Sequence, residues 1–266
     1  MSNSFLLYEQ QGHVVTLTMN EPARRNPLTG NTAAAEFVAA CDRISRDPEV
    51  RCVILTGAGT AFSAGGDLKD MRRHTSGEVP GHQIRQEYRF GIQLVPQALF
   101  NLEVPVIAAV NGAAIGAGCD LACMCDLRIA SEQARFAESF VKVGLVPGDG
   151  GAWLLPRLIG MARAAQLSFT GDMIDAAQAL SWGLVSEVVP AAELMTAARA
   201  LAERIAANPP HAVRMTKRLL REGLHVRIES ALETAAAFQA LAHQTEDHSE
   251  AVEAFLAKRP PVFRGR

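Results

Sequence analysis

The central feature of this sequence is the stretch Val106-Ile-Ala-Ala-Val-Asn-Gly-Ala-Ala-Ile-Gly-Ala-Gly-Cys-Asp120. It begins with apolar and β-branched residues, which predict a short buried strand. The pair Asn111-Gly112 and the small residues 116–118 then predict a turn. Apolar residues after Asp120 predict a helix. The stretch is therefore expected to form a strand, a tight loop and a helix in succession.

Such a corner is suited to holding negative charge. Small residues let another backbone or a ligand approach closely. The first turn of a helix leaves backbone N–H groups without partners, all pointing in one direction. Asp120 lies just inside the expected helix, so a carboxylate is expected beside the same corner. The sequence thus predicts an anion hole with an acid next to it.

A second corner repeats this pattern earlier in the chain. Residues 52–56 predict a strand, residues 57–67 form a loop rich in glycine and alanine, and Leu68 begins an expected helix. If the two corners meet, one backbone N–H from each could converge on a single oxygen atom. That arrangement is the geometry of an oxyanion hole.

The remaining elements predict an α/β fold followed by a helical region. Strands alternate with helices up to about residue 160, and almost only helices follow. The expected strands are 5–9, 14–19, 50–56, 106–110, 126–130, 134–137 and 185–189. The expected helices are 31–46, 84–101 with an irregularity near Pro96, 152–159, 162–169, 176–182, 191–207, 212–222, and 228–257 with a break near Thr245.

Composition excludes several classes of protein. A net charge of −2 with dispersed Arg and Lys argues against a nucleic-acid surface. The uncharged run 104–119 is too short and too rich in glycine for a membrane span, and residues 1–4 show no signal-peptide pattern. Five cysteines without a Cys-x-x-Cys pair predict reduced thiols in a cytoplasmic protein. We expect no membrane partner and no nucleic-acid partner.

Three motif-like patterns are better explained by packing. Gly57-x-Gly59 follows a strand, but the third glycine of a dinucleotide fingerprint is replaced by Phe62. Residues 61–65 are one residue short of a serine-hydrolase elbow. The close cysteines 119, 123 and 125 lack a further ligand for a metal site. No metal or redox cofactor is indicated.

Taken together, these residues resemble the crotonase superfamily, also called the enoyl-CoA hydratase/isomerase family. The resemblance covers nearly the whole chain. It implies stacked ββα turns in a spiral core over residues 1–190, and a helical region over 191–266 used to form a homotrimer or a dimer of trimers. Its anchors are Arg25-Asn-Pro-Leu28, Ala61-Phe-Ser-Ala-Gly-Gly-Asp-Leu68, Pro105–Gly112 with Gly116-Ala-Gly-Cys-Asp120, Cys125–Ala130, Val143-Gly-Leu-Val-Pro147 and Trp182-Gly-Leu-Val185.

The resemblance also implies an acyl-CoA thioester as substrate, so coenzyme A belongs to the substrate and is not a separate cofactor. The thioester oxygen would accept hydrogen bonds from the backbone N–H groups of Gly66 and Ala117. Those donors would stabilise the enolate charge that develops on this oxygen. The residues implied in binding CoA or the acyl group are Arg24, Arg25, Ala64, Gly65, Gly66, Asp67, Leu68, Ala117 and Phe140, together with Lys258, Phe263 and Arg264 reaching a neighbouring subunit's CoA.

The acidic residues depart from the pattern of the family's hydratases. Typical members use two glutamates, and Asp120 occupies the first position with a shorter carboxylate side chain. Phe140 occupies the second, and a phenyl ring cannot transfer a proton. Glu138 and Asp149 lie nearby, but neither aligns with a known role. In some isomerases of the family an Asp stands one residue before Asp149, where this chain has Gly148.

The sequence therefore leaves the reaction open between two activities. Hydration uses two carboxylates well, and we place enoyl-CoA hydratase first, with Asp149 or Glu138 supplying the second acid. Isomerisation needs only one base to remove and return a proton, so an enoyl-CoA isomerase acting through Asp120 or Asp149 is the alternative. A non-catalytic acyl-CoA-binding protein is a third hypothesis, and a family hydrolase, a decarboxylase or an RNA-binding homologue are others. Phe90, Phe140 and Trp153 could line an acyl pocket or belong to the core.

Overall fold

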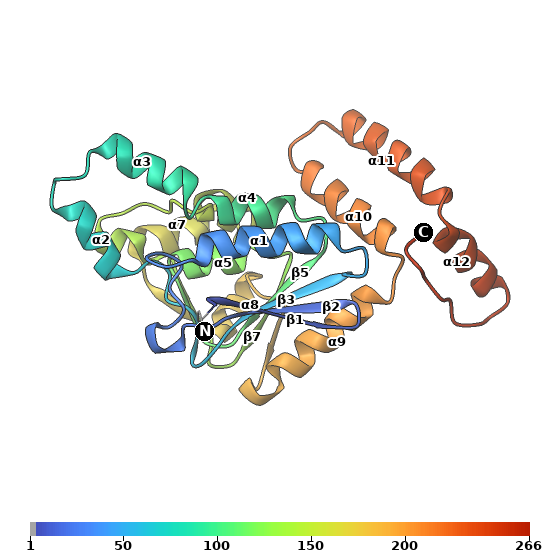
Figure 1. Cartoon of the computed structure of the whole chain (residues 1–266), viewed down its shortest axis with the longest axis horizontal. Coiled ribbons are helices and arrows are strands. Elements are labelled where there is room, and N and C mark those ends of the chain that lie inside the picture. Colours follow the sequence, from blue (N-terminus) through green and yellow to red (C-terminus); the bar gives the residue numbers. More distant parts are fainter. Residues whose placement is uncertain (1–3) are drawn as a thin grey trace.

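A computed structural model describes residues 4–266 of the chain, with two β-sheets and the helices that cover them (Figure 1). In the larger sheet β1 and β2 are antiparallel and all other neighbours are parallel. The strand order is β1 (Leu6–Gln11), β2 (Val14–Met19), β3 (Cys52–Gly57), β5 (Val106–Val110), β7 (Leu127–Ser131) and β10 (Glu187–Val189). The smaller sheet has the order β4 (Ala61–Ser63), β6 (Ala113–Ile115), β8 (Arg135–Ala137) and β9 (Met173–Asp175).

The chain visits the two sheets alternately. β3, β5 and β7 of the larger sheet are each followed directly by a strand of the smaller sheet, β4, β6 and β8, and then by helical segments. Each repeat is a ββα turn, and the turns stack through parallel pairing. The α/β spiral expected from the sequence is confirmed.

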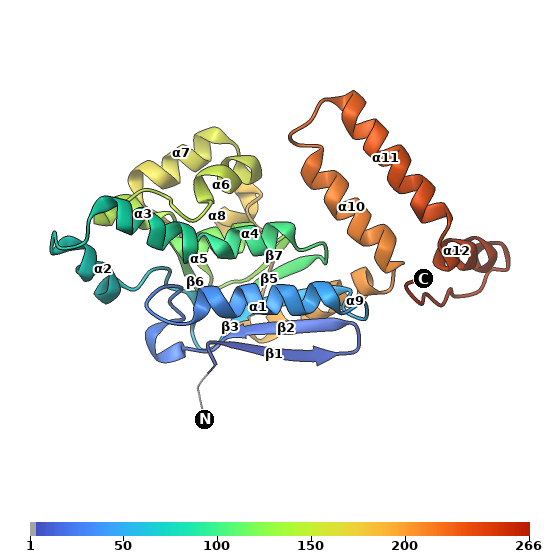
Figure 2. The ribbon, with the colours of Figure 1, turned by 45° about the horizontal axis from the view of Figure 1, so that its top comes forward.

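The helices cover both faces of the larger sheet (Figure 2). Alternate residues of its strands point to opposite faces, so Val53 and Leu55 join one apolar cluster while Ile54 joins another. The first cluster packs under the helices α1 (Ala33–Arg46), α4 (Leu94–Asn101) and α5 (Ala117–Met124). The second packs under α9 (Leu194–Ala206), whose small buried residues recur every fourth position.

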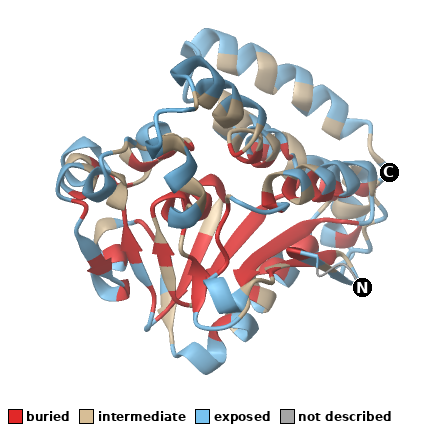
Figure 3. Ribbon diagram, turned by 60° about the vertical axis from the view of Figure 1, so that its left-hand side comes forward, coloured by how far each residue is buried: buried red, intermediate tan, exposed pale blue. Residues whose placement is uncertain are grey.

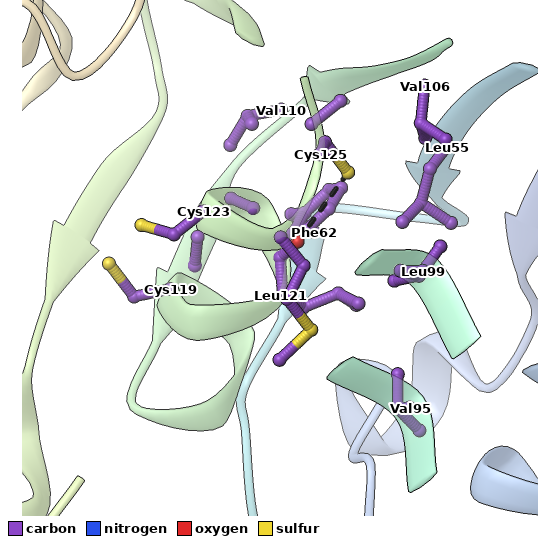
Figure 4. Packing of buried hydrophobic residues seen from close by; sticks show 14 of the residues in the cluster. Leu55, Phe62, Val95, Leu99, Val106, Val110, Cys119, Leu121, Cys123 and Cys125 are labelled. Carbon is purple, nitrogen blue, oxygen red and sulfur yellow. Dashed lines mark hydrogen bonds between the residues drawn. The ribbon is translucent and has the colours of Figure 1, made fainter. Parts of the chain in front are cut away.

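Helix α5 lies at the centre of the first cluster, and all eight of its residues are buried. Leu121 packs on the side of Val95 and Leu99 in α4, whereas Cys119 and Cys123 point the other way (Figure 4). A helix that is buried on every side normally contains apolar residues all round. The only charged residue in it, Asp120, is therefore unusual for its surroundings.

The last three helices extend away from the spiral core: α10 (Pro210–Glu222), α11 (Ile228–His243) and α12 (Glu246–Leu256) (Figures 1 and 2). Lys217 anchors α10, since its Nζ lies 2.7 Å from Asp126 Oδ2 and donates to the Val104 carbonyl at 2.7 Å. Helix α11 is apolar on average, but none of its residues is buried (Figure 3). The division of the chain at residue 190 stays a prediction.

Two details of the predicted element order are wrong. The helix expected over 84–101 is two helices, α3 (Gly81–Phe90) and α4, which separate at Gly91 and not at Pro96. A methyl group on Gly91 would lie 2.5 Å from the Glu87 carbonyl oxygen, whereas Pro96 sits in the first turn of α4, where its missing N–H costs little. The short strands β4, β6 and β9 lie in stretches expected to be loops.

The remaining helices are α2 (Leu68–Thr75), α6 (Gly151–Ile159), α7 (Met161–Thr170) and α8 (Ala176–Trp182), and α8 packs against β8 and β9 of the smaller sheet. Short 3₁₀ turns occur at Pro22–Arg24, Ser139–Val143 and Ala191–Glu193. No helix in the described part of the chain is long and apolar enough to cross a membrane.

Candidate active site

The two glycine-rich corners are in contact, as the sequence analysis required for an oxyanion hole. Gly65 has φ 81°, and a methyl group on it would lie 2.3 Å from the Ile115 carbonyl oxygen and 3.1 Å from the Ala117 nitrogen. A methyl on Gly118 would lie 2.3 Å from the Ser63 carbonyl oxygen. Only glycine permits these backbone approaches, which explains the glycines of both corners.

A buried asparagine fixes the geometry of the first corner. The Asn26 side chain is fully buried and donates to the carbonyl oxygens of Ala58 and Ala61, both at 3.0 Å. Ser63 Oγ donates to the Asn26 carbonyl at 2.7 Å and accepts from Gly65 N–H at 3.1 Å. This network holds the corner rigidly, and a structural role for Asn26 was not predicted.

The two predicted oxyanion donors are free to bind a ligand. Among residues 4–266, neither the Gly66 N–H nor the Ala117 N–H has a backbone or side-chain acceptor. Ala117 is the first residue of α5, where the N–H has no acceptor within the helix. A methyl group on Gly66 would lie 2.3 Å from Met71 Cε, so the Met71 side chain borders the position in front of Gly66.

Three carboxyl groups lie buried behind this corner: Asp120 of α5, Glu138 after β8 and Asp149 before α6. Their exposed fractions are 0%, 1% and 4%. Both oxygens of Asp120, both of Glu138 and Oδ1 of Asp149 have no hydrogen-bond partner. Isolated buried carboxylates are costly, so a cluster of three is a strong indication of a functional site.

The start of α6 packs directly against the Asp120 carboxyl group. A methyl group on Gly151 would lie 1.8 Å from Asp120 Oδ1. Gly150, with φ 107°, caps the helix and turns the chain so that its N-terminus faces this carboxyl group. The positive end of the α6 dipole therefore points toward a group that carries negative charge when ionised.

The pKa values of all three acids are raised. Burial, followed by repulsion from Glu138, raises the pKa of Asp120 well above its ordinary value. Burial raises the pKa of Glu138 to about 7 and that of Asp149 to about 6. Two adjacent buried carboxyl groups repel each other when both are ionised, so the Asp120–Glu138 pair retains a proton near neutral pH and can donate it.

Aromatic residues border the same region. The Phe140 ring lies 3.7 Å from the position of a methyl group on Gly116, at the start of the second corner. Tyr88 of α3 contacts the loop before Asp149, since a methyl on Gly148 would lie 3.2 Å from its ring. Gln93 Nε2 donates to the Gly148 carbonyl at 2.9 Å and fixes that loop. Tyr88 and Gln93 were not singled out from the sequence, because surface helices commonly contain such residues.

The predicted CoA-binding residues fall into two groups. Arg24 lies at the first corner, where it bonds Glu21 and Asp67, and the N–H of Asp67 donates to Thr29 Oγ1 at 2.9 Å. Arg25 is exposed at the same loop, Ala64 is partly buried, and Leu68 is 62% exposed at the start of α2.

The residues predicted from the C-terminus are not brought to this corner within one chain. Lys258 is exposed after α12, and Arg51 donates to the Phe263 carbonyl at 3.0 Å. Arg264 N–H donates to Asp247 Oδ1 of α12 at 2.7 Å. The C-terminal segment therefore folds against its own α12 and the start of β3.

Two other aromatic residues were considered for an acyl pocket. Phe90 is 70% exposed and lines a cavity together with Thr29 and Met71, near Gly66. Trp153 packs edge-on against Phe100, with ring centroids 5.6 Å apart, in an apolar cavity beneath α10. Within residues 4–266, no group of three or more His, Cys, Asp or Glu side chains could hold a metal ion.

The arrangement combines two kinds of catalytic group. Two free N–H donors at the touching corners can stabilise negative charge on a carbonyl oxygen. A carboxyl pair that holds a proton near neutral pH can act as acid and base on the atoms beside that carbonyl. The site is therefore equipped to form an enolate and to move protons at carbon.

Comparisons with known proteins agree with this chemistry. The family described as Enoyl-CoA hydratase/isomerase matches residues 9–266. The chain is 40% identical over 257 residues to the short-chain-enoyl-CoA hydratase of Clostridium acetobutylicum, covering 96% of this chain and 95% of the relative. It is 38% identical over 262 residues to the 1,2-epoxyphenylacetyl-CoA isomerase of Escherichia coli, covering 98% and 99% of the two proteins.

A solved structure gives the same assignment. The enoyl-CoA hydratase of Bacillus anthracis superposes with a TM-score of 0.92 at 35% identity, covering 99% of this chain and all of that one. The sequence match, the shared spiral and the touching glycine corners lead to one conclusion: this chain belongs to the enoyl-CoA hydratase/isomerase family, within the crotonase superfamily.

Proposed function

We propose that this protein is an enoyl-CoA hydratase, which adds water across the double bond of a 2-enoyl-CoA. The observation that carries the proposal is the position of Glu138 beside Asp120. Both carboxyl groups are buried, and repulsion from Glu138 helps to raise the pKa of Asp120. Phe140 occupies the family's second glutamate position, but Glu138, two residues earlier, supplies a carboxyl group to the same cluster. The two aligned glutamate positions hold only one acid, Asp120, and Glu138 supplies the second.

The proposed reaction uses both N–H donors and both acids. The thioester oxygen accepts hydrogen bonds from Gly66 and Ala117, which stabilise the enolate charge formed when water attacks the β-carbon. The ionised member of the Asp120–Glu138 pair takes a proton from that water. The protonated member gives a proton to the α-carbon, so H and OH are both added and the pair has exchanged its proton.

Isomerisation is the second candidate, and Asp149 is the observation in its favour. Asp149 is 4% exposed, and burial alone raises its pKa to about 6. A single base of this kind could remove a proton from one carbon and return it to another. The 38% identity to a relative named as an isomerase supports keeping this alternative.

The proposed substrate carries CoA along the first corner. Arg24 and Arg25, with the backbone of residues 64–68, are proposed to hold its phosphates and pantetheine. Lys258, Phe263 and Arg264 are proposed to reach the CoA of a neighbouring subunit, because the C-terminal segment packs against α12, away from α2 and the first corner of its own chain (Figure 1).

We propose a homotrimer or a dimer of trimers. Support comes from the helices α10 to α12, which expose large apolar residues. Examples are Leu220, Leu232 and Leu241, each more than 60% exposed. Sedimentation equilibrium should give three or six copies, and a monomer would contradict the proposal. A cytoplasmic setting is also proposed, supported by five free buried cysteines.

The test of function is incubation in D₂O with crotonyl-CoA and, separately, with a 3-enoyl-CoA, followed by mass spectrometry. A hydratase yields a 3-hydroxyacyl-CoA that contains one added water. A shifted double bond without added water would favour the isomerase. Binding of acyl-CoA with no change in either substrate would indicate a non-catalytic acyl-CoA-binding protein and contradict both.

A further inference from the structure

A cavity borders the loop that leads to Asp149. It has a volume of about 550 Å³ and lies between α3 and the loop before Asp149. Gly148, which lines it, directly precedes Asp149. Its lining residues are Arg85, Tyr88, Arg89, Gln93, Leu145, Val146 and Gly148. The cavity is therefore walled by apolar loop residues on one side and by two arginines on the other.

The two arginines are available to bind an anion. Arg85 and Arg89 are four residues apart, so they lie on one face of α3. Neither forms an ion pair with any described residue, and the only acid in α3, Glu87, is already paired with Arg73 and His74. Like charges at this spacing repel each other mildly, and a bound anion would remove that repulsion.

Tyr88 shows how this cavity relates to the oxyanion corner. Its ring also lines a neighbouring cavity that contains Thr29 and Met71, the residues next to Gly66 and Asp67. The two cavities therefore meet at Tyr88, one reaching the residues beside Gly66 and the other reaching the arginines of α3. A thioester bound at Gly66 and Ala117 would present its α- and β-carbons to the acids and its remaining acyl chain toward the arginines.

From this arrangement we infer that the acyl group of the substrate ends in a carboxylate, which Arg85 and Arg89 bind in the cavity beside α3. The inference rests on the proposed acyl-CoA function and narrows its substrate class. Guanidinium groups bind carboxylates through paired, charge-assisted hydrogen bonds.

The same arginines could instead bind a phosphate of CoA, and the test separates the two sources of negative charge. Adipyl-CoA and hexanoyl-CoA have six-carbon acyl groups and the same CoA, and differ by one terminal carboxylate. Succinyl-CoA and butyryl-CoA form a matching four-carbon pair. Titration calorimetry of the whole protein with both pairs measures the preference for the acid without requiring turnover.

We expect the acid of at least one pair to bind about tenfold or more tightly than its neutral partner. The double substitution Arg85→Met and Arg89→Met should remove this preference and leave the neutral ligand's affinity unchanged. Arg72→Met, which changes an exposed arginine of α2 outside the cavity, should keep the preference. Equal affinity for acid and neutral ligands in both pairs would overturn the inference.

Equal weakening of both ligands by the double substitution would overturn it too, because it would show that the arginines bind CoA. The proposed hydratase function is judged separately, by the turnover of crotonyl-CoA. A protein that hydrates crotonyl-CoA but ignores the terminal carboxylate would refute only the inference. A protein that prefers the acid but turns over no enoyl-CoA would refute only the proposed reaction.

Discussion

At the scale of single residues, the site depends on glycines as much as on acids. Gly65, Gly118 and Gly151 each occupy a position where a methyl group would lie 1.8 to 2.3 Å from a neighbouring oxygen atom. The first two bring the N–H groups of the corners together. The third leaves room for the Asp120 carboxyl group beside the N-terminus of α6.

Gly151→Ala should therefore reduce activity although it adds no polar group. The new methyl would displace the Asp120 carboxyl group, and a misplaced catalytic group costs on the order of 100-fold in rate. The measurement is kcat/KM for crotonyl-CoA, together with circular dichroism to show that the fold persists. Gly81→Ala is the control, since nothing lies within 4 Å of the added methyl. Activity within threefold of the unmodified protein would contradict this role of Gly151.

At the scale of secondary-structure elements, α10 is anchored to the core by a buried ion pair. Lys217 is 6% exposed and Arg221 is partly buried, and both bond to Asp126. Removing one partner of a buried pair leaves an uncompensated charge in an apolar setting.

Asp126→Ala should lower the free energy of unfolding by about 3 to 5 kcal/mol. Arg221 and the buried Lys217 would both lose their carboxylate partner, and the Val106 N–H would lose its acceptor. Urea denaturation measures the change. Asp42→Ala serves as the control, because its pair with Arg46 is exposed to solvent and should contribute little to stability. Similar losses for the two variants would show that α10 is not held in this way.

The elements with a clear apolar period were predictable from the sequence, whereas three of the five three-residue strands were not. β5 and α5 have five and eight consecutive buried residues, which the run from Val106 indicated. β4, β6 and β9 have three residues each, too few to show a period of two. Their pairing depends on strands distant in sequence.

Some features of the candidate site could likewise be predicted from the sequence, and others could not. The two corners could be predicted because glycine patterns are local. That Glu138 would lie beside Asp120 could not, because it depends on how the end of β8 meets α5. Tyr88, Gln93 and the arginines of α3 reach the site only through tertiary packing, and their residue types are common on surface helices.

At the scale of the whole molecule, the buried acids make stability depend on pH. Burial raises the pKa of Glu138 from its ordinary 4.5 to about 7. Between these two pH values the folded state keeps a proton that the unfolded state has released. The contribution of Glu138 to stability is therefore fully present below about pH 4.5 and is lost as the pH rises through 7.

Glu138→Gln should consequently stabilise the protein at pH 8, by up to about 3 kcal/mol, and have little effect at pH 4.5. Thermal unfolding at the two pH values measures the difference. Glu132→Gln, an exposed change on the turn after β7, is the control and should show no such pH dependence. A variant that is destabilised at pH 8 would mean that the ionised Glu138 is well solvated in the folded protein.

The central claim is that Asp120 and Glu138 together hydrate an enoyl-CoA. The most direct test is the initial rate of crotonyl-CoA hydration, followed by loss of the conjugated-thioester absorbance, for the unmodified protein, Asp120→Asn and Glu138→Gln. We expect each substitution to lower kcat by about 100- to 10,000-fold, because each removes one acid–base group. If Glu138→Gln retains kcat within tenfold of the unmodified protein, Glu138 does not replace the family's second glutamate and the proposed mechanism is wrong.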